Sequence, residues 1–422
     1  MSKLYIEGGY PLAGEVSVAG NKNAALPILA ATLLTDDEII LKNLPDILDV
    51  RRMVRLLECI GKKTEYKSRN IIAISGAVSN NKLPEEHAGQ LRASILLLAG
   101  LLLKTGEAFL FPPGGCVIGR RKVDSHFEMV EDFGGEVVSD HSGFHITLGE
   151  QKAASIFLKE VSVTATENVM ILAAGIKGRS VIQNAACEPH VVDLAEFLVK
   201  LGAKIEGAGT NRIMIEGSHC LTGAEHSITP DPIEAGTFAI AAAATGGEMV
   251  IHNAMKEHFY SMGRMLRSMN VMFKFQDEKT LHLFPSKLEI KEKKLQVGLW
   301  PNFPTDLMSP AIVLATQAKG SILCHDWMFE SRMFFVDKLN IMGADIIQAD
   351  PHRVIVNGPT KLYGQHLTSP DIRAGIALVI AALAAQGNSV IDNIETVDRG
   401  YEEIENRLNH LGSKVRREEH HH

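Results

Sequence analysis

A cysteine within a glycine- and proline-rich segment is the first place where this sequence could do chemistry. Cys116 follows Gly114-Gly115 in the segment 111–119, and three cations follow it at positions 120–122. Nearby positive charge favours the reactive thiolate form of a cysteine. We therefore interpret Cys116 as an acid or a nucleophile, and Cys59 and Cys187 as inert buried thiols.

Cations stand at the starts of three predicted apolar helices. Lys22, Arg92 and Arg373 each precede a long apolar run. A helix start has free N–H groups and a partial positive charge, so a cation there is unfavourable unless an anion relieves it. These starts are therefore candidate phosphate or carboxylate sites. The alternative, simple helix capping, stays open for Thr166 and Glu234.

An aspartate and two arginines complete the candidate chemistry. Asp306 follows Pro304-Thr305 at another helix start and could act as a base towards a hydroxyl group. Arg399 stands before Gly400 in a predicted turn and could bind an anion in a bidentate way. Arg332 is a weaker candidate of the same kind, and for both arginines an ordinary surface position is the alternative.

Composition narrows the class of protein. The 422 residues are 45% hydrophobic and 22% charged, with a net charge of −7, which predicts a globular protein without a basic field for nucleic acid. The five cysteines are widely spaced and odd in number, which indicates reduced thiols in the cytoplasm. No metal-ligand spacing is present, so we expect neither a metal nor a cofactor. The apolar runs are too short to span a membrane, and we expect no membrane partner.

A repeat organises the chain and must position these residues. Six amphipathic helices end in a turn residue, and these turns are spaced by 68 to 73 residues, at Gly61, Gly134, Gly202, Asn270, Gly343 and Gly412. Glycine or asparagine after a helix end supplies a left-handed residue. Six marks at such regular spacing indicate internal duplication.

A second set of six helices, apolar all round, alternates with the first set. They are predicted to begin near positions 23, 92, 166, 234, 306 and 371. Helices of this kind are buried, and short strands such as 71–74, 213–215 and 354–356 lie between the helices. We predict an α/β fold of two lobes with three units each, divided near the two-proline segment 229–232.

Several motifs together resemble the UDP-N-acetylglucosamine 1-carboxyvinyltransferase family of enolpyruvyl transferases. The matching segments occur in the family's order at 20–34, 91–100, 113–124, 183–193, 234–238, 303–306, 329–332 and 398–405. The resemblance implies an inside-out α/β barrel architecture with six βαβαββ-type repeats and a substrate cleft. It also implies a first lobe at 20–229, a second lobe at 1–19 and 230–418, and a tag remnant at 419–422.

The resemblance also implies roles for individual residues. Cys116 is expected to protonate the enol carbon and to react with fosfomycin, and Asp306 to act on the sugar 3-hydroxyl. For phosphoenolpyruvate, it implies phosphate contacts by Lys22, Asn23, Arg121 and Arg399 and carboxylate contacts by Arg332 and Arg373. For UDP-N-acetylglucosamine, it implies contacts by Arg92, Arg121, Lys122, Val123, Asp124, Ser125, Ser162, Val163, Thr164 and the Met328 carbonyl, with Asp371 as a further substrate-binding residue.

The sequence departs from the family pattern at several positions. Lys122 replaces a proline, Glu160 replaces a lysine, Pro232 replaces a frequent arginine, and the segment 307–310 also differs. One alternative is therefore a paralogous enolpyruvyl transferase with another nucleoside or phosphorylated acceptor. A second alternative is a catalytically silent relative that senses UDP-sugars, although Lys22, Cys116, Asp306 and Arg399 are all present.

Overall fold

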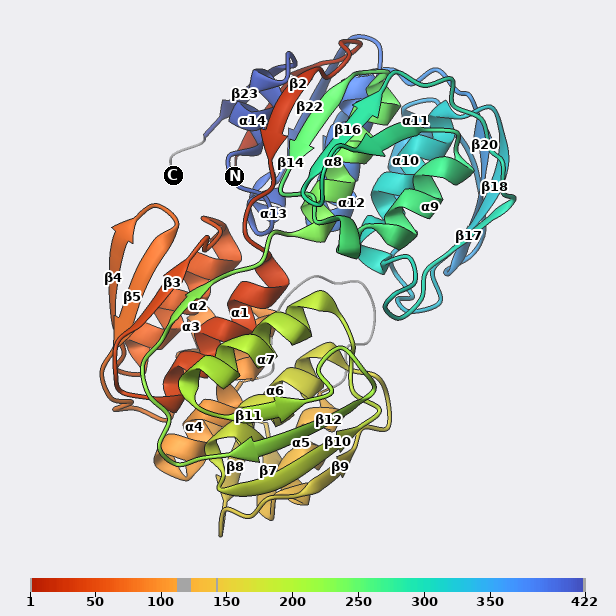
Figure 1. Ribbon diagram of the computed structural model, residues 1–422. Helices are drawn as coiled ribbons and strands as arrows, with labels where there is room; N and C mark the ends of the chain where they lie inside the picture. The colour runs from red at the N-terminus through yellow and green to blue at the C-terminus, as the bar shows by residue number, and fades with distance from the viewer. Residues whose placement is uncertain (1, 112–122, 142, 420–422) are drawn as a thin grey trace. The chain divides into compact units, whose positions relative to one another are not determined.

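The computed structural model describes residues 2–111, 123–141 and 143–419 (Figure 1). These residues divide into two compact units. We call the described residues between 20 and 229 the N-unit, and residues 2–19 and 230–419 the C-unit. Cys116, Arg121 and Lys122 lie outside the described residues.

Three sheets belong to the described part of the N-unit. In strand order they are β13 (Glu225–Ser227), β3 (Ile39–Lys42), β5 (Ile71–Ser75) and β4 (Lys63–Ser68); β6 (Glu107–Leu110), β8 (Gly143–Leu148) and β7 (Gly135–Asp140); and β11 (Lys204–Glu206), β12 (Arg212–Gly217), β10 (Gly178–Gln183) and β9 (Ser155–Phe157). Strand β13 pairs with β3, so the last strand of this unit completes its first sheet.

Three further sheets belong to the described part of the C-unit. They are β21 (His366–Thr368), β22 (Asn388–Asp392), β1 (Lys3–Glu7) and β23 (Lys414–Glu418); β15 (Met272–Phe275), β16 (Thr280–Phe284), β14 (Met249–His252) and β2 (Gly14–Ser17); and β17 (Lys294–Gln296), β18 (Gly320–His325), β20 (Arg353–Gly358) and β19 (Asp345–Asp350). Strand β1 lies between β22 and β23, and β2 pairs with β14, so the N-terminal residues belong to this unit.

The sheets repeat one pattern. In each four-stranded sheet, a short edge strand pairs in parallel with its neighbour, and the other pairs are antiparallel. The sheet of β6, β8 and β7 has an isolated parallel bridge from Lys82 to Phe109 at the equivalent edge. This repetition confirms the predicted α/β fold of six related units.

The apolar helices form the centre of each unit, as predicted. In the N-unit they are α1 (Lys22–Ala31) with η1 (Thr32–Leu34), η2 (Arg92–Leu96) with α4 (Leu97–Thr105), and α6 (Val163–Gly175); in the C-unit they are α8 (Pro232–Thr245), η4 (Thr305–Leu307) with α10 (Met308–Gln317), and α12 (Ile372–Ala384). Helices α8, α10 and α12 pack on one another, with sheets outside them (Figure 1). Burial of apolar surface on all sides stabilises these helices, which explains why their sequences lack a polar face.

The starts of the buried helices differ in how their free N–H groups are satisfied. Four of them have a side-chain cap, from Asn21, Ser162, Asp231 and Asp371. The other two begin with the 3₁₀ turns η2 and η4 and have no side-chain cap. The third helix begins at Val163, three residues before the predicted start, because Ser162 rather than Thr166 is the cap.

The amphipathic helices and their turns also follow the repeat. They are α2 (Leu48–Cys59), α5 (Asp124–Asp132), α7 (Pro189–Leu201), α9 (Tyr260–Ser268), α11 (Val336–Ile341) and α14 (Ile404–His410); α3 (Glu85–Ala88), η3 (Lys256–His258) and α13 (Glu395–Asp398) are short additions. All six predicted turn residues have positive φ, from 61° at Asn270 to 118° at Gly202. No helix of the described residues is long and apolar enough to cross a membrane.

Candidate functional site

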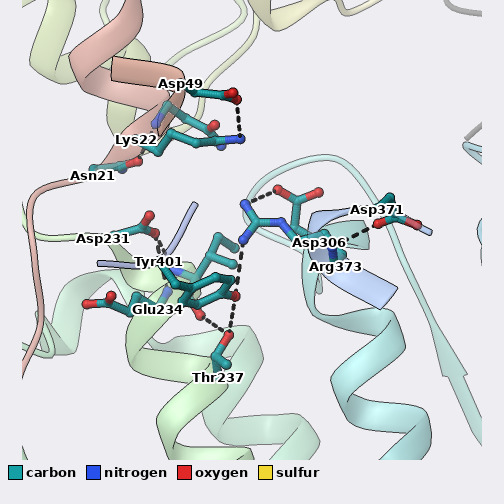
Figure 2. Close-up of polar contacts among 12 residues, drawn as sticks. Asn21, Lys22, Asp49, Asp231, Glu234, Thr237, Asp306, Asp371, Arg373 and Tyr401 are labelled. Atoms are coloured by element: carbon teal, nitrogen blue, oxygen red, sulfur yellow. Dashed lines mark hydrogen bonds and ion pairs between the residues drawn. The ribbon is translucent and has the colours of Figure 1, made fainter. Parts of the chain in front are cut away.

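Asp306 lies between two buried arginines in the C-unit. Its Oδ2 is 2.7 Å from Nη2 of Arg373 (Figure 2). Its Oδ1 is 3.3 Å from Nη2 of Arg332. The side chains of the two arginines are 3% and 6% exposed, whereas that of Asp306 is 27% exposed. The carboxylate is therefore oriented by two guanidinium groups while part of it stays accessible.

Arg373 is surrounded by acidic and polar partners. It follows the cap residue Asp371, whose carboxylate accepts the backbone N–H of Arg373. Burial by itself lowers the pKa of Arg373, but the charge of Asp306, together with Tyr401 and Asp231, outweighs burial and raises the pKa. The guanidinium is therefore a fixed cation at the start of α12.

Arg332 has donor capacity that Asp306 does not use. Its Nε is buried and has no hydrogen-bond partner among the described residues. Leaving a buried charged donor unpaired is costly, so an acceptor at this position would be favourable. The interpretation of Arg332 as an ordinary surface arginine is wrong, because only 4% of the residue is exposed.

One buried carboxylate anchors both Asp306 and Met328. Asp326 accepts a hydrogen bond from the hydroxyl of Thr305, which precedes Asp306. It also accepts hydrogen bonds from the backbone N–H groups of Met328, at 3.0 Å, and Phe329, at 3.3 Å. Asp326 is completely buried. The turn that contains Met328 and the short helix η4 are thereby fixed to each other.

Arg399 ends the short helix α13, next to a double ion pair. The guanidinium of Arg417 binds both oxygens of Asp398 and both oxygens of Glu405, with all four distances at 2.8 Å. Bidentate pairs of this kind restrict geometry as well as contributing energy. Strand β23, which contains Arg417, therefore fixes the segment 398–405 on both sides of Arg399.

In the N-unit, Lys22 is the first residue of α1 and faces Asp49. Its Nζ is 3.9 Å from Oδ2 of Asp49 (Figure 2). Nη1 of Arg52 is 3.7 Å from Oδ1 of the same carboxylate. The cap residue Asn21 accepts the backbone N–H of Asn23 at 2.9 Å. Two cations thus lie beside one aspartate at the positive end of a helix.

Several of the described residues predicted to bind a nucleotide lie near His126 in the N-unit. The Nδ2 of Asn168 donates to the Nδ1 of His126, so the proton of His126 is on Nε2, which donates to the hydroxyl of Thr164 at 3.1 Å. Burial, with a smaller effect of Arg92, lowers the pKa of His126 to about 3, which keeps the ring neutral. This link holds the start of α5 against the start of α6.

The remaining predicted residues lie around the same two helix starts. Val123 precedes α5, Asp124 and Ser125 are its first residues, and Ser162 and Val163 begin α6. The hydroxyl of Ser125 donates to Glu160 at 3.4 Å. Glu160, which departs from the pattern expected at this position, thus has a partner in the N-unit.

Three kinds of partner were missed by the sequence analysis. Asp49 is the partner of Lys22, Asp326 anchors Met328, and Tyr401 with Thr237 supports Arg373. Tyr401 could have been found from the sequence, since it directly follows Arg399-Gly400. The other contacts arise only when distant elements pack together. No group of three or more metal-ligand side chains occurs among the described residues.

Thr166 and Glu234 are not the helix caps that the alternative interpretation expected, because Ser162 and Asp231 hold those positions, but both have structural partners. The Thr166 hydroxyl donates to the Ser162 carbonyl and accepts the Ala186 N–H. Glu234 pairs with Arg407 and accepts the backbone N–H of Ala19. Both polar side chains are thus used to join neighbouring segments within their own units.

Comparison with known folds gives high structural similarity to enolpyruvyl transferases. NikO from Streptomyces tendae has a TM-score of 0.88 at 22% identity and covers 99% of this chain and 98% of its own. EPSP synthase from Acinetobacter baumannii has a TM-score of 0.76 at 16% identity, with 99% and 100% covered. At these identities the similarity shows a shared fold.

Sequence comparison defines the family. Residues 6–408 match the family described as EPSP synthase (3-phosphoshikimate 1-carboxyvinyltransferase). The UDP-N-acetylglucosamine 1-carboxyvinyltransferase of Bradyrhizobium diazoefficiens is 45% identical over 98% of this chain and 97% of its own length, and that of Treponema denticola is 42% identical over 98% and 99%. The chain therefore belongs to the UDP-N-acetylglucosamine 1-carboxyvinyltransferase family.

Proposed function

We propose that this protein transfers the enolpyruvyl group of phosphoenolpyruvate to the 3-hydroxyl of UDP-N-acetylglucosamine and releases phosphate. The observation that carries the proposal is 45% identity, over nearly the full length of both chains, to a relative named for this reaction. The reaction is the first committed step of peptidoglycan precursor synthesis, so its cellular context is cell-wall formation, cell shape and division. We place it in the cytoplasm, where reduced cysteines are expected.

The reaction requires an acid and a base in its addition step. The oxygen of the sugar 3-hydroxyl bonds to C2 of phosphoenolpyruvate, and the Cys116 thiol gives a proton to C3. Asp306 takes the hydroxyl proton, which its accessible carboxylate and fixed orientation support. The product of addition is a tetrahedral phospho-ketal.

Elimination then breaks the C2–O bond to phosphate. The electron pair of that bond leaves with phosphate, which takes the proton held by Asp306. The Cys116 thiolate left by the addition step takes a proton from C3, which restores both the double bond and the thiol. Fixed cations can stabilise the charge on the leaving group without a metal ion. We assign this task to Lys22, Arg121 and Arg399, with Asn23 beside them. The position of Lys22 at the positive end of α1 supports its assignment.

Arg332 and Arg373 are the proposed partners of the phosphoenolpyruvate carboxylate. Each arginine binds Asp306 through one Nη2 atom, and the buried Nε of Arg332 has no acceptor within the described residues. A planar carboxylate suits the fork of guanidinium donors. The substrate would therefore complete the hydrogen bonding of this group.

The proposed nucleotide contacts belong to the N-unit and to one turn of the C-unit. Arg92, the segment 121–125 and the segment 162–164 are assigned to the uridine diphosphate, and the Met328 carbonyl to the sugar. The link between His126 and Thr164 supports the first assignment, because it fixes α5 and α6 relative to each other. The Asp326 anchor supports the second, because it fixes the Met328 backbone.

Phosphate release tests the proposed function. Purified protein with phosphoenolpyruvate and UDP-N-acetylglucosamine, in the presence of a metal chelator, should release one phosphate for each enolpyruvyl product. Fosfomycin should add covalently to the wild-type protein and leave Cys116→Ser unmodified, as measured by intact mass. Release with another nucleoside or phosphorylated acceptor, and none with UDP-N-acetylglucosamine, would identify a paralogous transferase. No release with any acceptor, despite UDP-sugar binding, would identify a sensor.

A further inference from the structure

Tyr401 is a fully buried tyrosine that contacts Arg373. It is 1% exposed and lies in the segment between α13 and α14, two residues after Arg399. Its hydroxyl is 2.9 Å from the Thr237 hydroxyl and 3.2 Å from Nη1 of Arg373 (Figure 2). The hydroxyl group is therefore the point where the segment that contains Arg399 meets α8 and α12.

The direction of each hydrogen bond in this group follows from the chemistry of its members. A guanidinium can only donate, so the Tyr401 oxygen accepts from Arg373 and its proton is directed to Thr237. Thr237 in turn donates its proton to the Ile233 carbonyl at 2.8 Å. Burial raises the pKa of Tyr401, and its hydroxyl therefore keeps the proton that this arrangement needs.

The arrangement holds Arg373 by both ends of its guanidinium group. Nη1 is bound to Tyr401, while Nη2 is bound to Asp306 at 2.7 Å. A planar group held by two of its nitrogens has a defined plane, whereas one contact would leave it free to rotate. The Tyr401 ring also lies next to the guanidinium, with 5.8 Å between its centroid and Cζ of Arg373.

We propose that Tyr401 is a positioning residue, whose hydroxyl sets the plane in which Arg373 meets both Asp306 and the carboxylate of phosphoenolpyruvate. The inference rests on the proposed function and extends it to a residue outside the predicted site. It assigns Thr237 a supporting role, since Thr237 keeps the Tyr401 hydroxyl directed so that its oxygen faces Arg373. Neither Tyr401 nor Thr237 needs to contact a substrate.

Tyr401→Phe removes one oxygen atom and tests this inference directly. The buried Nη1 of Arg373 loses its acceptor, so we expect the KM for phosphoenolpyruvate to rise about tenfold and kcat to fall roughly threefold. The KM for UDP-N-acetylglucosamine should stay within about twofold. Thr237→Val should act in the same direction with a smaller effect, and Thr237→Ser, which keeps the hydroxyl, should restore wild-type kinetics.

Thr32→Val is the matched structural control. Thr32 is a fully buried threonine of the N-unit whose hydroxyl donates to the Leu29 carbonyl, as the Thr237 hydroxyl donates to a helix carbonyl, but without a tyrosine partner. Its removal should lower the melting temperature without changing either KM. A Tyr401→Phe protein that only loses thermal stability, or whose two KM values rise equally, would overturn the inference.

Two further measurements keep the test independent of the proposed function. Absence of phosphate release by the wild-type protein would count against the proposed function, whereas normal wild-type release with unchanged Tyr401→Phe kinetics would count against this inference alone. In nitrogen-15 NMR of the arginine side chains, the Arg373 Nη protons should exchange with solvent faster in Tyr401→Phe. Unchanged exchange would overturn the inference even in a protein without activity, and Thr237→Val gives the same readout if Tyr401→Phe does not fold.

Discussion

The two acidic side chains near Arg373, Asp306 and Asp231, differ in how far they are buried. Asp306 keeps part of its carboxylate accessible, whereas Asp231, the cap of α8, is 6% exposed. Burial raises the pKa of Asp231 to about 6, although the charge of Arg373 opposes this rise and that of Glu234 adds to it. The Asp231 side chain thus caps α8, and the ionisation of this buried carboxyl group lowers the stability of the fold.

Asp231→Asn should change how stability depends on pH. The folded pKa of about 6 lies above the ordinary value of 3.8, so the unfolded chain loses this proton first as the pH rises. The contribution of Asp231 to stability therefore falls between about pH 4 and pH 6 and is then constant, a loss of about 2 to 3 kcal/mol. Asparagine keeps the cap oxygen that binds Ile233 N–H and cannot ionise. Relative to wild type, the variant should gain that amount between pH 4 and pH 8, measured by urea unfolding.

Asp371→Asn is the control for this measurement. Asp371 also accepts two backbone N–H groups at a helix start, but it is only half-buried. The desolvation that causes the effect at Asp231 is therefore smaller there. Equal pH dependence in both variants, or none in Asp231→Asn, would contradict the assignment of burial as the cause.

At the scale of elements, the repeat depends on residues that tolerate positive φ. The six turns after the amphipathic helices have this geometry, and so do Asn43, Asn184, Asn253 and Asn393, each of which directly follows a strand. The side chains of Asn43, Asn184 and Asn393 each donate to the backbone carbonyl of another segment. These asparagines are a second repeated mark, which the segments 41–43, 182–184, 251–253 and 391–393 display in the sequence.

Substitutions at Gly412 isolate the cost of the left-handed turn. Gly412 has φ of 90° and no atom within 4 Å of an added Cβ, so alanine meets strain but no clash. Gly412→Ala should lower the free energy of unfolding by about 1 kcal/mol, and Gly412→Asn by less, because asparagine tolerates this conformation. At Gly61, where an added Cβ would lie 2.3 Å from the Ser79 hydroxyl oxygen, alanine should cost more. Equal costs for Ala and Asn at Gly412 would contradict this explanation.

The sequence was sufficient to predict the elements that carry a strong local signal. Glycine or asparagine at regular spacing revealed six units, and all-round apolar runs revealed the buried helices. The three-residue edge strands, such as β9 and β13, were not predicted, because so short a strand has no periodicity and its partner is far away in the sequence. Tertiary contacts rather than local preference determine these pairs.

The same limit explains which residues of the candidate site could be predicted from the sequence and which could not. Lys22 and Arg373 were predicted because a cation at the start of an apolar helix is unfavourable without an anion, and Asp306 because a proline and a threonine place its carboxylate at a helix start. Their partners were not, since Asp49 is on an outer helix and Tyr401 follows a short one, where such residues are ordinary. Local chemistry therefore predicted the candidate site residues, and only the fold revealed the groups that orient them.

At the scale of the whole molecule, the net charge of −7 opposes anionic substrates. Attraction must therefore come from cations that the fold holds locally, such as Lys22 and Arg52 beside Asp49, and Arg332 and Arg373 beside Asp306. Short-range fields of this kind act over about 10 Å in salt solution, so they favour a bound anion without changing the overall charge. Each group is built within a single unit of the fold.

The two units should also unfold in separate transitions, so that a destabilising core substitution in one unit lowers only its own transition. Ile171 of α6 is completely buried in a cluster whose members all belong to the N-unit, and Ile312 of α10 is completely buried in the C-unit. Replacing either isoleucine by alanine should cost about 3 kcal/mol, and replacing it by valine about 1 kcal/mol. In differential scanning calorimetry, Ile171→Ala should lower one transition by roughly 6 to 12 °C, and Ile312→Ala should lower a different one. Smaller shifts for the valine variants would confirm that the loss of packed side-chain volume causes the effect. A single transition that both alanine substitutions lower equally would show instead that the two cores unfold as one cooperative unit.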